Sequence, residues 1–479
     1  MSSHLVAERP RVMIWTLAIC AASPSLLLSL VVPTLADMPD MLHVSVGNAS
    51  WIVTAPLLSS SVTLPVLSRM ADMYGRRRIL LVSLWCLLSG SVLASFTSLF
   101  PMVVAGRALQ GCGSGMVPIA FGIARQSLPR ERFHSGVALI SGATGVGLAL
   151  GVPFAGVITN LLGWSAAFWF PGIVGLFLVV AVICSVPSDS SSTRGGFDIV
   201  GSVVLGATLV ALLVAISYGP SWGWISPRVL ALLLVSALGA TVWIPRQLGS
   251  AAPTVDLRLA MIRPVLMTNL SAGFITLALI SNLVVTPLQV TAPEATGYGL
   301  GLTGFEAGVL MLPFGLVLLG GAPIAGRLLS RWGAQRVLAL GAAVLALSFL
   351  VRIAVSTTIL GVILTTMIAG VGLAPTLAGI PALILASVPP ADSAAASGVN
   401  NLVRSIASCL VSPGIAVLVS MASVTVMGED YLSTVGLHLY FMLAALCSLI
   451  AAGLAVLITP LRPRREVSIT VPETSADLA

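Results

Sequence analysis

Long apolar segments separated by short polar turns repeat along the whole chain. A helix needs about 20 mostly apolar residues to cross the hydrocarbon core of a membrane. On that template the expected spans are Trp15–Ala36, Ser50–Met70, Ile79–Leu99, Met102–Ala124, Ser135–Thr159, Ala166–Val186, Ile199–Gly219, Arg228–Gln247, Val265–Thr291, Leu302–Leu329, Val337–Val355, Thr358–Ala386, Ala395–Met421 and Leu437–Thr459. The pattern therefore predicts an all-α membrane protein with 14 transmembrane helices.

Two polar breaks, 187–198 and 248–263, set the seventh and eighth expected spans apart from the rest. The expected domains are an N-terminal six-helix bundle over 1–187, a linker with two extra transmembrane helices over 188–263, a C-terminal six-helix bundle over 264–463 and a disordered cytoplasmic tail over 464–479. A chain of twelve spans, in which two long buried segments are misread as transmembrane helices, is the alternative that the pattern leaves open.

A short basic turn occurs once in each half of the chain. Superposing Ser68–Arg78 on Gly326–Arg336 pairs Arg69 with Arg327, Gly75 with Gly333 and Arg78 with Arg336. In both copies an apolar segment enters the turn and another leaves it. This repeat indicates that the two halves are related by duplication, which is typical of transporters.

Composition agrees with a membrane protein, because 57% of the residues are hydrophobic, only 8% are charged and the mean hydropathy is +1.06. A water-soluble domain needs a far more highly charged surface. All 23 basic residues are arginine, in a chain with a net charge of +7. Because these arginines lie in short loops beside apolar spans, we expect membrane lipid rather than nucleic acid as their partner.

The loop charges predict the orientation. Basic residues concentrate on the cytoplasmic side of membrane proteins. Of the 23 basic residues, 19 fall in the N-terminal arm, the expected cytoplasmic loops and the tail. Arg228 and Arg352 fall on the outer side, and Arg107 and Arg404 fall within spans. The distribution predicts a multi-pass protein of the inner (plasma) membrane with both termini in the cytoplasm.

Three motifs resemble those of the major facilitator superfamily. Ala71–Arg78 resembles its signature loop, Arg107–Gly113 resembles its intramembrane arginine motif, and Gly147–Gly156 resembles its antiporter motif. With fourteen spans, the chain is most similar to the drug:proton antiporters of that superfamily, the multidrug-resistance type. The resemblance implies the major facilitator fold, two six-helix bundles plus two extra central spans, and transport by alternating access.

In that superfamily the signature loop and its copy form a cytoplasmic latch that breaks when the transporter switches. The resemblance assigns the latch to Asp72, Gly75, Arg76, Arg77, Arg78, Gly333 and Arg336. Gly75 permits a tight backbone reversal, and Asp72 can accept hydrogen bonds from arginine or face the positive end of a helix. The alternative is that the arginines only set the topology and contact lipid.

Arg107 would lie well inside the bilayer, where an uncompensated charge costs at least about 2.5–3.5 kcal/mol. Gln110 lies on the same helix face, and we expect the two in one polar network. The resemblance implies that Arg107 takes part in proton transfer or organises that network. The alternative is a structural role in which Arg107 pairs with backbone carbonyls.

Proton coupling normally needs a carboxylate whose pKa is raised by burial. No acidic residue falls at the centre of an expected span, and Pro24 stands where relatives commonly have an acid in the first span. Glu306 is the best candidate for the protonated group, and an ordinary acid at a helix N-terminus is the alternative. No cofactor is expected, apart from the proton as coupling ion.

The antiporter motif contributes Gly147, Gly151, Pro153 and Gly156. Small residues four apart make a smooth helix face on which another helix can move, and Pro153 should bend the span. The resemblance associates this element with export. Ordinary tight helix packing is the alternative.

The expected substrate cavity contains Asn269, Asn282, Asn400, Asn401 and Arg404. Because no acidic residue accompanies them, we expect a neutral or anionic amphipathic substrate rather than a dication. Hydrogen bonds between helices are the alternative role for each asparagine.

The sequence thus predicts a monomeric, proton-gradient-driven exporter of amphipathic small molecules such as drugs or antibiotics. A dedicated exporter or facilitator of one endogenous metabolite or lipid, not coupled to protons, is the first alternative. A membrane enzyme or sensor is the second. The chain has no lysine and hence no Walker motif, its six cysteines never form a CxxC pair, and its four histidines do not converge on a catalytic or metal site.

Overall fold

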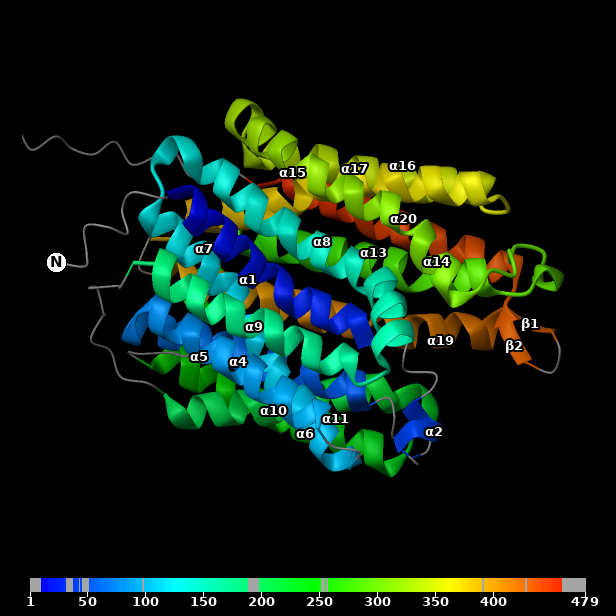
Figure 1. Cartoon of the computed structure of the whole chain (residues 1–479), viewed down its shortest axis with the longest axis horizontal. Coiled ribbons are helices and arrows are strands. Elements are labelled where there is room, and N and C mark those ends of the chain that lie inside the picture. Colours follow the sequence, from blue (N-terminus) through cyan, green and yellow to red (C-terminus); the bar gives the residue numbers. More distant parts are fainter. Residues whose placement is uncertain are drawn as a thin grey trace, which may run out of the picture.

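The computed structural model describes residues 10–31, 38–42, 44, 51–96, 99–187, 198–250, 255, 257–389, 392–426 and 429–458. In this part of the chain almost all regular structure is helical, and most helices run along one axis (Figure 1). The first group of helices is α1 (Pro10–Val31), α2 (Met38–Leu42), α4 (Trp51–Tyr74), α5 (Arg76–Ser95), α6 (Phe100–Gly111), η2 (Cys112–Gly115), α7 (Met116–Ser127), α8 (Arg130–Leu162) and α9 (Ala166–Ser185). We call this group the N half.

The middle of the chain forms α10 (Ile199–Trp222), α11 (Pro227–Gly249) and α12 (Leu257–Ala260). The C half then comprises α13 (Arg263–Thr291), η3 (Glu294–Thr296), α14 (Gly304–Leu310), α15 (Leu312–Trp332), α16 (Ala334–Val355), α17 (Ile359–Ser387), α18 (Ser393–Cys409), α19 (Val411–Met421), β1 (Ser423–Val426), β2 (Glu429–Leu432) and α20 (Thr434–Val456). Strands β1 and β2 pair antiparallel as a hairpin.

Twelve helices in the described residues are long and apolar enough to cross a membrane. They include α10 and α11, the two extra spans expected in the middle of the chain. The fourth expected span coincides with α6, η2 and α7, where a short 3-10 turn interrupts the helix, and the fifth coincides with α8. Neither of these two is among the twelve, so the count of fourteen crossings stays a prediction.

The two basic turns have the same local structure, as duplication of the halves would produce. Gly75 joins α4 to α5 with φ of 97°, and Gly333 joins α15 to α16 with φ of 79°. Such angles favour glycine. Two residues after each glycine, a side chain donates to a backbone carbonyl of the last helix in the same half. Arg77 donates to Ile183 of α9 at 2.7 Å, and Gln335 donates to Val456 of α20 at 2.9 Å.

The halves meet along several helices. α8 packs against α15 and α17, and α18 packs against α4 and α7. One apolar cluster continues across both halves, in which Ala325, Leu329 and Val337 join Leu128 and Ala138. Because these residues lie near the end of the molecule that carries Gly75 and Gly333, which we call the Gly75 end, the halves are closed together there.

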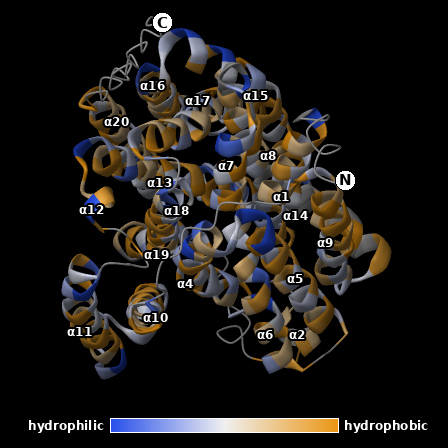
Figure 2. Ribbon diagram, turned by 90° about the vertical axis from the view of Figure 1, so that its left-hand side faces the viewer, coloured by the Kyte–Doolittle hydropathy of each residue, from blue (hydrophilic) through white to orange (hydrophobic). Residues whose placement is uncertain are grey.

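The hairpin of α10 and α11 lies at one side of this arrangement, with α11 outermost (Figure 2). α10 contacts α4 of the N half as well as α18 and α19 of the C half, whereas α11 packs mainly on α10. Exposed apolar side chains line α11, among them Leu234, Leu238 and Val242. In a membrane these side chains would face lipid.

Candidate functional site

A cavity of about 170 Å³, which we call the large cavity, lies between the two halves. α1, α4, η2, α7 and α8 line it from the N half, and α13, α17 and α18 line it from the C half. Its walls are mainly apolar, and no acidic residue lines it in the described part of the chain. A concave and largely apolar site with a few polar groups is the usual form of a small-molecule site.

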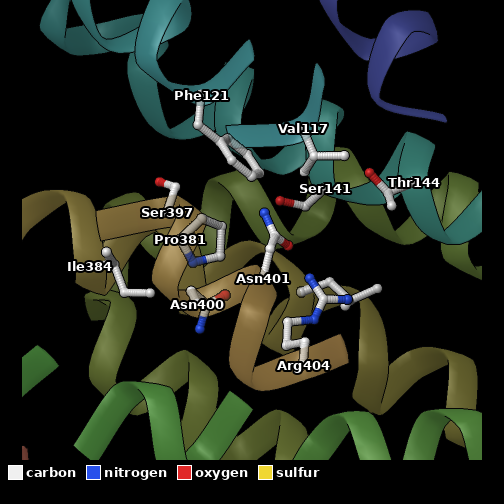
Figure 3. Close-up of a pocket in the computed structure, with 11 residues that line it drawn as sticks. Val117, Phe121, Ser141, Thr144, Pro381, Ile384, Ser397, Asn400, Asn401 and Arg404 are labelled. Atoms are coloured by element: carbon white, nitrogen blue, oxygen red, sulfur yellow. The ribbon is translucent and has the colours of Figure 1, made fainter. Parts of the chain in front are cut away.

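A second space of about 20 Å³, the small pocket, adjoins the large cavity, because Val117, Thr144, Leu377, Asn401 and Arg404 line both. Figure 3 shows that its walls come from α7 and α8 on one side and from α17 and α18 on the other. Ser141 and Ser397 also line it, and both hydroxyls are buried without a hydrogen-bond partner among the described residues.

Arg404 stands where the small pocket and the large cavity meet. Its Nε donates to Thr276 Oγ1 of α13 at 3.2 Å. Within the described residues its two terminal nitrogens have no such partner, so they are available to the space that the residue lines. Asn401 is oriented toward the Val117 and Ser141 side of the pocket in Figure 3.

The other three predicted cavity asparagines lie in contacts between helices. Asn400 Nδ2 donates to Asn269 Oδ1 at 3.0 Å and so links α18 to α13. Asn400 also lines the small pocket, but Asn269 does not. Asn282 Oδ1 accepts from Arg352 at 3.0 Å, and Asn282 lines neither space. A substrate-binding role for the asparagines stays a prediction.

Arg352 lies in the last turn of α16, within the expected span Val337–Val355, and is 1% exposed. Its guanidinium donates to Gln289 Oε1 at 2.9 and 3.2 Å and to Asn282 Oδ1, and it lies 5.0 Å from the ring centre of Phe441. Amide oxygens and an aromatic face make burial of this charge tolerable.

Arg107 of α6, in the N half, is a second deeply buried arginine and is also 1% exposed. Its Nε donates to the carbonyl of Ile52 at 2.8 Å, and its Nη1 donates to Gln110 Oε1 at 2.8 Å. Gln110 in turn donates to Ser91 Oγ at 2.9 Å, so the three side chains form one hydrogen-bonded chain. Arg107 Nη2 is buried with no partner in the described residues and adjoins a space of about 40 Å³ that Pro24 also lines.

At the Gly75 end Arg76 is the centre of a buried contact between the halves. Arg76 Nη2 lies 3.0 Å from Asp72 Oδ1 of its own half, and the same nitrogen donates to Ser393 Oγ of α18 at 3.2 Å. Arg125 of α7 adds a second bond, 2.9 Å to the carbonyl of Val388. Ser393 and Arg125 could not be predicted from the sequence, because their partners are 317 and 263 residues away along the chain.

The remaining predicted latch residues do not join this contact. Arg77 bonds within the N half, as described above. The side chains of Arg78 and Arg336 are exposed. Gly75 and Gly333 shape the turns. Among the predicted latch residues, the described contacts show Arg76 bonded across the interface, with Asp72 paired to it from the same half.

The antiporter motif faces α1. A methyl group added at Gly147 would meet the carbonyl oxygen of Ala22, and one added at Gly151 would meet Ser29 Oγ. Ser29 Oγ itself lies 3.3 Å from the carbonyl of Gly147 and donates to it. Pro153 and Gly156 lie in α8, but their surroundings fall outside the described residues.

Glu306 lies away from the cavities, at the start of α14. Thr303 Oγ1 accepts from Glu306 N at 3.3 Å, while Glu306 Oε2 accepts from Thr303 N at 2.8 Å. This reciprocal pair is a capping box, which stabilises a helix N-terminus. The side chain is exposed, and its role in proton transfer stays a prediction. No cluster of three or more potential metal ligands occurs in the described residues.

Comparison with known proteins identifies relatives of this chain. Residues 17–413 match the family described as the Major Facilitator Superfamily. The tetracenomycin C resistance and export protein of Streptomyces glaucescens is 28% identical over 295 residues, which cover 61% of this chain and 54% of that protein. This chain thus spans about half the length of that relative. The lincomycin resistance protein LmrB of Listeria monocytogenes is 27% identical over 338 residues, 69% of each chain.

Solved structures share the fold at low sequence identity. The human organic anion transporter MFSD10 superposes with a TM-score of 0.61 at 14% identity, over 94% of this chain and 98% of that one. The proton:xylose symporter XylE gives a TM-score of 0.61 at 14% identity, over 91% of this chain and 94% of that one.

Proposed function

Because the chain belongs to the Major Facilitator Superfamily, we propose that it exports amphipathic small molecules across the plasma membrane by alternating access. The observation behind this proposal is the large cavity, which lies between the halves and is walled by both of them. Motion of one half relative to the other would therefore change the shape and access of the cavity. The named activities of the relatives, resistance and export, support the same direction of transport.

We further propose that the chain crosses the membrane fourteen times with both termini in the cytoplasm. The segment of α6, η2 and α7 supports a further crossing, since together they span residues 100–127. α8, with 33 residues, is long enough for another. On this proposal the Gly75 end is cytoplasmic, and the conformation described here is closed toward the cytoplasm.

Proton coupling is part of the proposal. The buried network of Arg107, Gln110 and Ser91 supports it, because a charge held without an acidic partner responds strongly to any nearby change in protonation. The candidate that would bind the proton is Glu306. The protein would act as a monomer without a cofactor.

One observation favours a second candidate, an exporter or facilitator that is not coupled to protons. Acidic residues are absent from the linings of all three spaces within the described part of the chain. Glu306 is engaged in a capping box outside them. On this second proposal the gradient of the substrate, or its charge, drives transport.

Transport in proteoliposomes distinguishes the two candidate functions. The vesicles are loaded with the neutral dye N-phenyl-1-naphthylamine, and pyranine trapped inside records the internal pH. The coupled exporter should move protons against dye, and a pH gradient that is acidic on the side receiving the dye should speed export. Arg107→Ala should abolish both movements, whereas Glu306→Gln should abolish proton movement alone if Glu306 binds the proton. Dye flux that ignores the gradient would establish the second candidate. Absence of flux for this and other amphipathic dyes would refute export.

A further inference from the structure

The small pocket brings together polar groups that lack partners. Ser141 of α8 and Ser397 of α18 are each 4% exposed, and their hydroxyls have no hydrogen-bond partner in the described residues. Buried polar groups in native proteins are nearly always paired, and exceptions commonly mark a place for water or a ligand. Here the two hydroxyls come from opposite halves and line one space (Figure 3).

Arg404 adds a positive charge to this place, and the described residues that line it include no acidic group. Within the described residues its side chain bonds to a neutral hydroxyl, that of Thr276. Neither the small pocket nor the large cavity has an acidic lining residue in the described part of the chain. Since buried charges in proteins are generally paired, the missing negative group is one that a bound molecule can supply.

The two spaces differ in character. The small pocket of about 20 Å³ has room for only a few atoms. The large cavity of about 170 Å³ has apolar walls that include Leu28, Leu57 and Leu279. Arg404 and Asn401 line both spaces and stand at the junction between them.

From this arrangement we propose that the substrate is an amphipathic organic anion. Its compact acidic head, a carboxylate or sulfonate, binds Arg404 and Asn401 and reaches the hydroxyls of Ser141 and Ser397. Its apolar body fills the large cavity. A guanidinium is suited to this task because it holds an oxyanion with two parallel hydrogen bonds.

This inference rests on the proposed export function and adds a reason for release. Ser141 belongs to the N half, whereas Arg404 and Ser397 belong to the C half. When the halves separate at this level, the head loses the contact with Ser141 and becomes hydrated. Binding of the anion therefore favours the conformation in which the Gly75 end is closed.

The test compares three naphthalenes with permanent head groups: 2-naphthalenesulfonate, the neutral 2-naphthalenesulfonamide and the cationic 2-naphthyltrimethylammonium. Binding to the full-length protein in nanodiscs is measured by calorimetry. The sulfonate should bind at least about 10-fold more tightly than the sulfonamide, since hydrogen bonds to charged groups are the stronger ones. The ammonium compound should bind least.

Substitutions identify the group responsible. Arg404→Gln should weaken sulfonate binding about 10- to 100-fold and change sulfonamide binding about twofold or less, and Arg404→Lys should restore part of the loss. Asn401→Asp places a carboxylate beside Arg404, so it should also weaken sulfonate binding while it improves binding of the ammonium compound. Arg228→Gln is the matched control, because Arg228 lies over Trp222 outside both spaces and its loss should change nothing.

The outcomes separate this inference from the export function. Equal affinity for sulfonate and sulfonamide, or an equal loss of both in Arg404→Gln, would overturn the anion site, since Arg404 would then be a structural cation. Flux of the same probes in proteoliposomes is measured in parallel. Sulfonate that binds as predicted but is not transported would leave the anion site standing and refute export. Transport of the ammonium compound without sulfonate binding would leave export standing and overturn the anion site.

Discussion

Arg76 is the residue whose replacement most directly tests the closed contact at the Gly75 end. Its Nη2 group bonds to Ser393 Oγ across the interface at 3.2 Å, while the ion pair with Asp72 stays within the N half. Opening of the Gly75 end must break the first contact but not the second. We predict that Arg76→Gln shifts the protein toward conformations open at that end.

The size of the shift follows from the bond that is lost. A hydrogen bond to a charged group contributes about 1.5–3 kcal/mol, and we take the lower end because Arg76 regains water when the interface opens. About 1.5 kcal/mol is roughly a tenfold change in the ratio of closed to open molecules. Ser393→Ala removes the same bond from the other side and should have a similar effect. The double variant should add little, because the two changes share one interaction.

Pulsed electron spin resonance can measure this ratio. Tyr74 and Trp332 each precede one of the two turn glycines and are 51% and 50% exposed, so spin labels at cysteines placed there, in a background without the native cysteines, report the distance between the halves. Arg76→Gln should increase the fraction of long distances.

Arg78→Gln is the matched control, because Arg78 belongs to the same turn and has the same charge but is exposed. If the arginines act only as a topology signal, the two variants should behave alike. Equal distance distributions in Arg76→Gln, Arg78→Gln and the parent protein would refute the latch.

Two further predictions concern packing and charge. Gly147→Ala should lower the Tm in detergent and slow transport, because the added methyl meets the Ala22 carbonyl and overpacking costs about 1–3 kcal/mol. Gly453→Ala is the control: there a methyl group enters open space, so the Tm should stay unchanged or rise. Similar losses of Tm in both variants would contradict the packing argument. The Arg246 guanidinium holds the pKa of Asp198 below its ordinary value, so the carboxylate stabilises the fold above about pH 4 and this contribution is lost as the pH falls through the lowered pKa. Asp198→Asn should therefore lower the Tm at pH 7 by more than at acid pH, and a difference in Tm that does not vary with pH would argue against the ion pair.

Hydropathy and turn chemistry made the long helices and the two glycine turns predictable from the sequence. A membrane requires about 20 apolar residues per crossing, and a glycine between two such segments marks a reversal. The interruption of the fourth expected span was missed, although its sequence, Gly111 to Gly115, contains three glycines. Glycine lowers the preference for an uninterrupted helix, so that signal was present.

The side-chain contacts were much less predictable, because they join residues far apart in the chain. Asn400 and Asn269 are 131 positions apart, and no local rule relates them. A signal existed for Arg352. Asn282 and Gln289 are seven positions apart, a spacing that places both on one helix face, and together they provide the oxygens that Arg352 needs. Ser141 and Ser397 of the small pocket, by contrast, resemble ordinary small residues of a membrane helix until the halves are brought together.

The two buried arginines show how burial alone fails to distinguish a structural charge from a functional one. Arg107 and Arg352 are both 1% exposed. Both terminal nitrogens and Nε of Arg352 donate to amide oxygens. Arg107 Nη2, by contrast, has no partner among the described residues and adjoins a space that Gln110 and Pro24 also line. We therefore predict opposite effects for the same substitution. Arg352→Gln should lower the Tm strongly, because breaking a buried charged network costs about 3–5 kcal/mol, while the folded fraction still transports.

Arg107→Gln should abolish most transport with a smaller loss of Tm, because Arg107 makes fewer bonds and its unpaired nitrogen already bears a cost that the substitution removes. Thermal unfolding and flux per folded molecule, measured on the same proteoliposome preparation, separate the two effects. If both variants lose stability and transport in the same proportion, the unpaired nitrogen has no special role, and Arg107 is a structural residue like Arg352.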